Sequence, residues 1–135
     1  MTGPRPLWSH QIELEAAPRS ASVTRAFISR CLVEHDLPYL LDPVRLVGSE
    51  LATNALVHAG TSFTVTLSQP DGHVLLAVRD GSASFPVHGH ADVLDTSGRG
   101  LGIVDVVSLD WGMRLDGAGF KSVWASFALR ADGAV

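Results

Sequence analysis

The sequence predicts an α/β protein, a two-layer α/β sandwich in which helices cover a mixed β-sheet. Segments whose apolar residues recur at helical spacing are interspersed with shorter segments in which apolar and polar residues alternate. Two pairs of these alternating segments are separated by turn sequences, which predicts two hairpins. Of the 135 residues, 46% are hydrophobic and 18% are charged, so the chain can bury the core of one domain.

The first part of the chain predicts a strand followed by a helix. In residues 10–16, apolar residues alternate with polar ones, as in a half-buried strand. Residues 18–35 then repeat apolar side chains at helical spacing, and Ser20 or Ser22 can open the helix. Cys31 lies on that apolar stripe and is the only cysteine, so we expect it to be a core residue.

A second helix is expected over residues 42–58. Asp42 is a suitable N-cap, Pro43 suits the first helical position, and Gly60 ends the helix. A loop as long as residues 80–97 is typical of a lid or a binding loop. The elements expected after the second helix are a strand at 61–68, a turn at 70–72, a strand at 73–79, the loop at 80–97, a helix at 100–109, a strand at 111–115, a turn at 116–119 and a strand at 121–129.

Charge and composition exclude several classes of function. Ten Lys and Arg against fourteen Asp and Glu give a net charge of −4, so no basic excess is present to bind a nucleic-acid backbone. The longest apolar run, Val74–Val78, is far shorter than the roughly 20 residues of a spanning helix. Residues 1–11 lack the apolar segment of a secretory signal. We therefore expect a cytoplasmic protein with no nucleic-acid or membrane partner, with one domain at 10–130 between tails at 1–9 and 131–135.

The second predicted helix carries two polar residues that could perform chemistry. Glu50 and Asn54 are four positions apart, so their side chains project from the same side of the helix. A carboxylate can accept a proton, and a carboxamide oxygen is a suitable ligand for Mg²⁺. Taken alone, the pair is equally well explained as part of a solvated helix face.

Two glycine-containing segments are further candidates. Asp80 follows a predicted strand and precedes Gly81, where a carboxylate could accept a hydrogen bond from an amine such as that of adenine. Taken alone, Asp-Gly is also an ordinary turn. The segment 98–102 has three glycines and an arginine at the start of a predicted helix, an arrangement that suits phosphate binding. The alternative interpretation of this segment is a helix start in which the glycines allow close packing. The segment matches neither the dinucleotide-binding pattern nor the Walker A pattern.

Other residues with chemical potential have simpler interpretations. We expect His58 to cap carbonyls at a helix end or to pack beside a pocket. His88 and His90 are expected to be solvated loop residues rather than metal ligands. Lys121 is expected to be solvated at the start of the last strand.

The order of these parts resembles the GHKL-type ATPase fold. Within it, the sequence is most similar to small bacterial anti-sigma-factor serine/threonine kinases. The segments that carry the resemblance are 50–59 (ELATNALVHA), 78–82 (VRDGS), 97–104 (SGRGLGIV) and 119–124 (GFKSVW). Each motif is weak alone, whereas their combination and order are specific.

The resemblance implies a role for each matching residue. Glu50 would be the general base toward the attacking hydroxyl, and Asn54 would bind the Mg²⁺ that bridges the ATP phosphates. Asp80 would accept a hydrogen bond from the adenine amino group, with Gly81 leaving room, and Ser122 would support both Asp80 and adenine. Residues 82–97 would form a lid over ATP. The residues expected to contact phosphate are Gly98, Arg99, Gly100, Leu101 and Gly102.

Two positions depart from the family pattern. Ala83 stands where the first glycine motif usually has a second glycine. The closing motif usually reads Gly-Lys-Thr, whereas here Phe120 separates Gly119 from Lys121, and Ser122 replaces the threonine. Neither departure removes an expected acidic or amide side chain.

The resemblance implies an ATP- and Mg²⁺-dependent serine/threonine protein kinase. Such a kinase phosphorylates an anti-sigma-factor antagonist, sequesters a sigma factor, and forms a homodimer. The alternative is a catalytically weak or inactive ATP-binding module that acts by docking to a partner. A histidine-kinase catalytic part is less favoured, because no phospho-acceptor hairpin precedes the domain.

Overall fold

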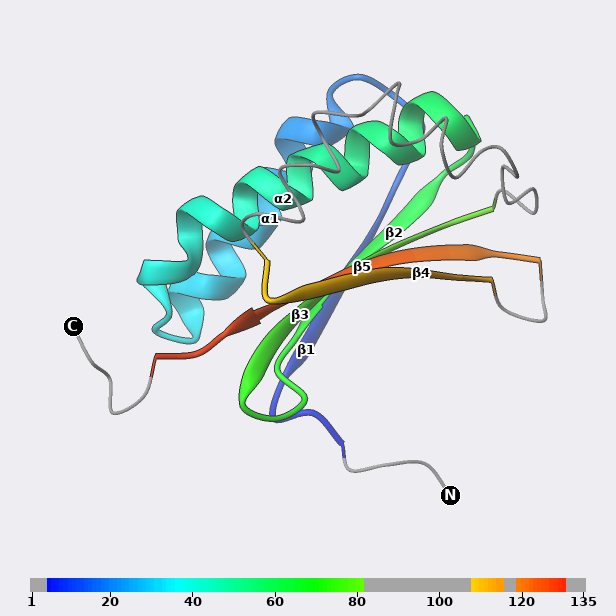
Figure 1. Cartoon of the computed structure of the whole chain (residues 1–135). Coiled ribbons are helices and arrows are strands. Elements are labelled where there is room, and N and C mark those ends of the chain that lie inside the picture. Colours follow the sequence, from blue (N-terminus) through cyan, green and yellow to red (C-terminus); the bar gives the residue numbers. More distant parts are fainter. Residues whose placement is uncertain (1–4, 82–107, 116–118, 131–135) are drawn as a thin grey trace.

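The computed structural model describes residues 5–81, 108–115 and 119–130, which form two helices packed on one sheet (Figure 1). Within these ranges, neither helix has the length and apolar character needed to cross a membrane. The elements in chain order are β1 (Ser9–Leu14), α1 (Ser20–Glu34), a 3₁₀ turn η1 (Pro38–Leu40), α2 (Leu41–Asn54), a π-helix η2 (Ala55–Ala59), β2 (Phe63–Ser68), β3 (His73–Asp80), β4 (Asp110–Leu115) and β5 (Lys121–Ala128).

The sheet has the strand order β1-β2-β3-β5-β4. The predicted two layers are confirmed, and the five predicted strands are found within two residues of their expected bounds. The expected mixed sheet is corrected for the described strands, because all four of their pairings are antiparallel. One helix between two neighbouring strands makes those strands parallel. Two helices connect β1 to β2, so the chain changes direction one more time and the two strands run antiparallel.

The core lies between the helices and one face of the sheet. Alternate residues of β2, β3 and β5 point to this face and are almost completely buried. The helices α1 and α2 lie side by side above it (Figure 1), and Arg25 Nη1 donates to Ser49 Oγ between them at 3.0 Å. A Cβ at Gly48 would clash with the buried Ile28 side chain, so a larger residue would force that side chain to move where the two helices approach.

The start of the second helix and the capping of the first differ from the prediction, although the first helix begins at Ser20 as expected. Helix α2 begins at Leu41, directly after η1, so Asp42 lies in its first turn and is not the N-cap. There its carboxylate still complements the positive end of the helix. Helix α1 begins at Ser20 after Arg19, and the Ser20 hydroxyl donates to the Glu15 carbonyl at 2.7 Å instead of capping the helix.

The end of the second helix combines a confirmed and an unpredicted feature. Gly60 terminates it in a left-handed conformation with φ +67°, as predicted. The final turn, Ala55–Ala59, widens from α to π geometry. Such π segments are rare and often occur at functional sites. Of the helix expected at 100–109, only Ser108 and Leu109 are described, and they form a bend before β4.

The start of the chain is paired beyond the end of β1. Leu7 N donates to the Gln69 carbonyl at 2.8 Å, and Gln69 N donates to the Trp8 carbonyl at 3.0 Å. The indole N–H of Trp8 also donates to Gln69 Oε1 at 2.9 Å. Part of the segment assigned to a tail therefore contacts the domain.

Candidate functional site

Asp80 and Lys121 form an ion pair beneath the helix layer. They stand opposite each other in the pairing of β3 with β5, and Lys121 Nζ lies 3.8 Å from Asp80 Oδ2. The side chain of Asp80 is only 2% exposed and that of Lys121 only 7% exposed. The expectation that Lys121 is solvated was therefore wrong. The paired carboxylate offsets part of the cost of removing the ammonium group from water.

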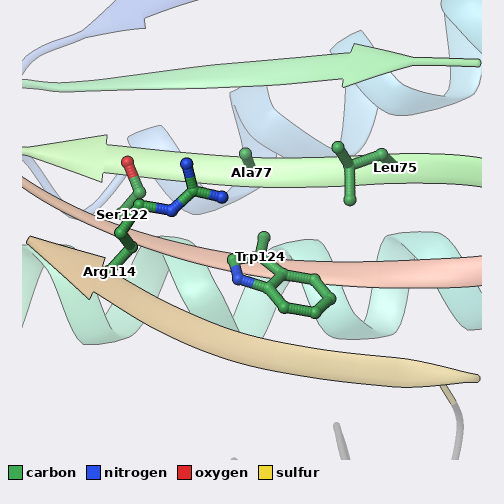
Figure 2. Close-up of a pocket in the computed structure, with 5 residues that line it drawn as sticks. All are labelled: Leu75, Ala77, Arg114, Ser122 and Trp124. Carbon is green, nitrogen blue, oxygen red and sulfur yellow. The ribbon is translucent and has the colours of Figure 1, made fainter. Parts of the chain in front are cut away.

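Ser122 lies on the other face of the sheet. Successive residues of a strand point to opposite faces, so Ser122 points away from the helices when Lys121 points toward them. Figure 2 shows Ser122 with Arg114 and Trp124 around an open pocket, with the helices behind the sheet. The expectation that Ser122 supports Asp80 is therefore corrected.

The inserted residue in the closing motif explains this change. Counted from Gly119, the third position is Lys121 and not a hydroxyl residue. A shift of one residue along a strand moves every following side chain to the opposite face. With Phe120 in the motif, the residue beside Asp80 is Lys121, a cation. The resemblance implied a hydroxyl residue at that place.

Gly81 fits between two side chains after the end of β3. Its N–H donates to Thr61 Oγ1 at 3.1 Å. A Cβ at this position would lie 3.3 Å from Thr61 Oγ1, which is tight, and 3.8 Å from Phe120 Cε1, which is an ordinary contact. The ring of Phe120 also lies under the Arg79 guanidinium, 3.9 Å from its carbon. Thr61 was not anticipated from the sequence, and its position directly after Gly60 is the only signal for it.

The end of α2 lies at the same end of the sheet as Asp80. Glu50 and Asn54 are both half-buried, and Asn54 is the last residue of the α-helix. Only a few residues separate η2 from Phe63, which pairs with Asp80. The π-helix packs against β3. The structure thus gathers the amide of Asn54, the carboxylate of Asp80 and Gly81 at one end of the molecule, with Glu50 one helical turn away.

His58 adds a polar atom in η2. Its Nε2 is buried and has no hydrogen-bond partner among the described residues. A buried polar atom without a partner is costly, and such atoms often contact a water or ligand. The sequence pointed to His58 as a residue at a helix end or beside a pocket but gave no signal that its Nε2 would be buried.

The expected phosphate-binding residues belong to a segment that the structure does not describe. Gly98, Arg99, Gly100, Leu101 and Gly102, together with the expected lid at 82–97, lie outside the described residues. The described residues of the candidate site offer the carboxylates of Glu50 and Asp80 and the carboxamide of Asn54. Those are groups that could hold an amine and an oxygen-ligated cation such as Mg²⁺.

Comparison with known proteins identifies a fold and no family. No family model matches the sequence, and no curated protein matches it. The fold is similar to the crystal structure of the RsbU and RsbW domains of Rv1364c from Mycobacterium tuberculosis, with a TM-score of 0.66 over 92% of this chain. The two sequences are 20% identical, and this chain spans 33% of that one. The likeness confirms an α/β sandwich of this type.

Proposed function

We propose that this protein binds Mg·ATP and acts as an anti-sigma-factor serine/threonine kinase. Its substrate would be an anti-sigma-factor antagonist, and it would sequester a sigma factor in the cytoplasm, as a homodimer. The observation that carries the proposal is the burial of Asp80 at the end of β3, at the same end of the sheet as Asn54. The order of the sequence motifs and the likeness in fold to a chain with an RsbW domain support it.

Each candidate residue has a defined task in this proposal. Asp80, whose side chain is almost fully buried, accepts a hydrogen bond from the adenine amine. Asn54 supplies a carboxamide oxygen to Mg²⁺, and the ion, when bound, neutralises charge on the phosphates. Glu50 accepts the proton of the substrate hydroxyl. Residues 98–102 donate backbone N–H groups to phosphate.

A second candidate function is a partner-docking module with weak or no catalysis. The ion pair between Lys121 and Asp80 favours it, because the ammonium group lies 3.8 Å from one oxygen of the carboxylate that should bind adenine. Replacing Lys121 with threonine gives this position the hydroxyl of the usual closing motif. If Lys121 limits nucleotide binding, Lys121→Thr should bind ATP more tightly than the natural protein.

The test is a titration of the purified chain with ATP and ADP, with and without Mg²⁺. Binding should be lost in Asp80→Asn, and its Mg²⁺ dependence should be lost in Asn54→Ala. Asp71→Asn, in the exposed turn between β2 and β3, is the matched control and should bind as the natural protein does. Unchanged ATP binding in Asp80→Asn would refute the proposed site.

Transfer is tested separately from binding. Glu50→Gln should retain ATP binding and lose the production of ADP in the presence of a purified antagonist domain. Equal ADP production by the natural protein and Glu50→Gln would contradict the kinase. In that case the docking module becomes the better account.

A further inference from the structure

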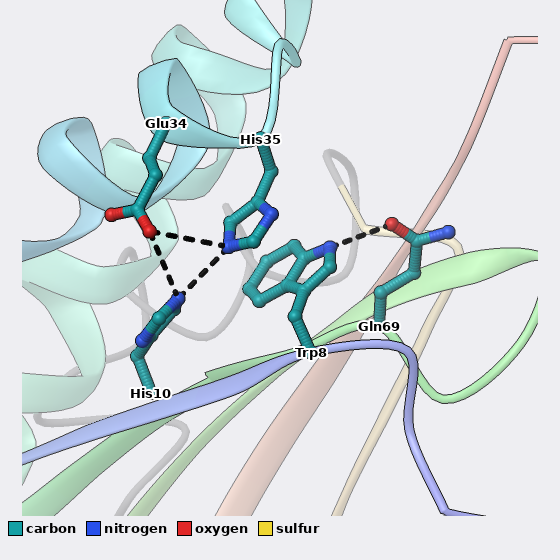
Figure 3. A network of polar contacts seen from close by, with 5 residues as sticks. All are labelled: Trp8, His10, Glu34, His35 and Gln69. Carbon is teal, nitrogen blue, oxygen red and sulfur yellow. Dashed lines mark hydrogen bonds and ion pairs between the residues drawn. The ribbon is translucent and has the colours of Figure 1, made fainter.

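A second polar cluster lies where β1 meets the end of α1. His10 comes from β1, Glu34 is the last residue of α1, and His35 follows it. The two Nε2 atoms are 2.8 Å apart, and Glu34 Oε2 lies 4.0 Å from each (Figure 3). Three potential ligand atoms from two elements therefore converge on one point.

We propose that His10, Glu34 and His35 bind a divalent transition-metal ion of the zinc class. Two imidazole nitrogens and one carboxylate oxygen are a donor set that zinc prefers. Mg²⁺ and Ca²⁺ prefer oxygen ligands throughout, so this donor set discriminates against them. Three protein ligands leave one tetrahedral position for water or another ligand.

The distances are close to those that such an ion requires. Two ligand atoms at tetrahedral zinc are separated by about 3.4 Å, given zinc–nitrogen bonds of about 2.0–2.1 Å. The nitrogen–nitrogen distance of 2.8 Å must lengthen, and the two 4.0 Å distances to Glu34 must shorten. The Glu34 side chain is 57% exposed, which leaves it free to make that adjustment.

The two imidazoles are held by their surroundings. The ring of Trp8 stacks on His35 with centroids 4.1 Å apart and an angle of 6° between the planes. Trp8 is held in turn by the hydrogen bond from its indole N–H to Gln69 (Figure 3). His10 is fixed by the pairing of β1 with β2, opposite Leu67. Supported ligands of this kind lose little freedom when a metal binds.

This cluster is separate from the site around Asp80. His10 is in register with Leu67 and Leu76, whereas Asp80 lies four residues further along β3. At about 3.3 Å per residue, the two rows are roughly 13 Å apart along the strands, and His10 lies two strands away from β3. The metal proposal therefore stands or falls independently of nucleotide binding.

A bound ion would cross-link β1 to the end of α1 through its protein ligands. The ligands His10 and His35 are 25 residues apart in the chain, and the ion would close that loop in the folded state. A ligand that binds only the folded form stabilises it in proportion to its concentration and affinity. The inferred role of the ion is structural: it would link the edge strand β1 to the end of α1 and stabilise their contact.

The experiment is a titration of the untagged, chelator-treated full chain with ZnCl₂ by calorimetry and with CoCl₂ by visible absorption. We expect one zinc per chain, intense tetrahedral cobalt bands, and a melting temperature that rises with zinc. His10→Ala and His35→Ala should each weaken binding at least about tenfold, and Glu34→Gln should also weaken it. MgCl₂ should not compete.

Two controls keep the result specific to this cluster. His73→Ala and the double variant His88→Ala/His90→Ala remove other histidines and should bind zinc as the natural protein does. His10→Gln, checked for folding by circular dichroism, tests the site if His10→Ala fails to fold. Zinc binding that is lost in the His88/His90 variant, unchanged in folded His10→Gln, or absent from the natural protein would overturn the proposal. The cluster would then be only a hydrogen-bonded pair of imidazoles.

Discussion

The two ends of the sheet both carry charged or titratable side chains on or beneath the helices, but they differ in exposure. At one end, Asp80 and Lys121 are almost fully enclosed and balance each other's charge. At the other end, His10 and His35 are 35% and 23% exposed beside the more exposed Glu34. Enclosed charges must be paired to be tolerated, whereas partly exposed groups can exchange partners with little cost. The first end thus holds its charges as an enclosed pair, whereas the side chains at the second end can adjust around a ligand.

The largest effect is expected from breaking the enclosed pair. Lys121→Met leaves the Asp80 carboxylate buried without its cation and should lower the free energy of unfolding by about 3 kcal/mol. The double variant Asp80→Asn/Lys121→Met removes both charges and should recover much of that loss. Urea denaturation of the two single variants and the double variant measures this coupling. If Lys121→Met has the stability of the natural protein, the pair contributes nothing.

A smaller effect is expected at the more exposed end. Trp8→Ala removes the stacking on His35 and the hydrogen bond to Gln69, and should cost about 1 kcal/mol of folding free energy. Trp8→Phe keeps an aromatic ring but loses the indole N–H, so it should fall between Trp8→Ala and the natural protein. Urea midpoints for the three proteins test this order. A Trp8→Phe variant as unstable as Trp8→Ala would assign the effect to the hydrogen bond alone.

The smallest effect concerns Cys31, one turn before His35 on α1. Burial raises the pKa of the Cys31 thiol, with Glu34 acting in the same direction and Arg30 opposing both. The folded state therefore holds this proton more tightly than the unfolded state. The resulting stabilisation is complete below the unfolded pKa of about 8.5 and is lost as the pH rises through the folded pKa.

Measurement of stability against pH tests this effect. Between about pH 8 and pH 10, the natural protein should lose more stability than Cys31→Ala. The thiol should also react slowly with a disulfide reagent under native conditions and rapidly in urea. A native reaction as fast as that in urea would show that the thiol is accessible.

The periodic features of the fold could be predicted from the sequence. Alternation of apolar residues gave the strands, and Gly60 marked the end of the second helix because it adopts φ +67° there. The same alternation contained the signal for Lys121, which shares a face with Val123. We nevertheless expected Lys121 to be solvated, because lysine generally prefers water. Its burial is made tolerable by Asp80, which comes from a different strand and so could not be paired with it from local spacing.

The two clusters show why the site was harder to predict than the fold. Ser122 was assigned by likeness to a motif, and one inserted residue, Phe120, was enough to put it on the wrong face. His10 and His35 have no motif, and they meet only because α1 folds back over β1. Contacts between distant segments depend on tertiary packing and leave little trace in local spacing.

The pairing of β1 has a consequence for the order of folding. Ser68 pairs with Leu75 across one short turn, whereas both helices lie in the chain between Ser9 and its partner Ser68. Closing a long loop costs more chain entropy than closing a turn, so we expect β1 to join the sheet late and to open early. Its backbone amides should therefore exchange with deuterium faster than those of β3, and a metal held by His10 would slow that exchange first.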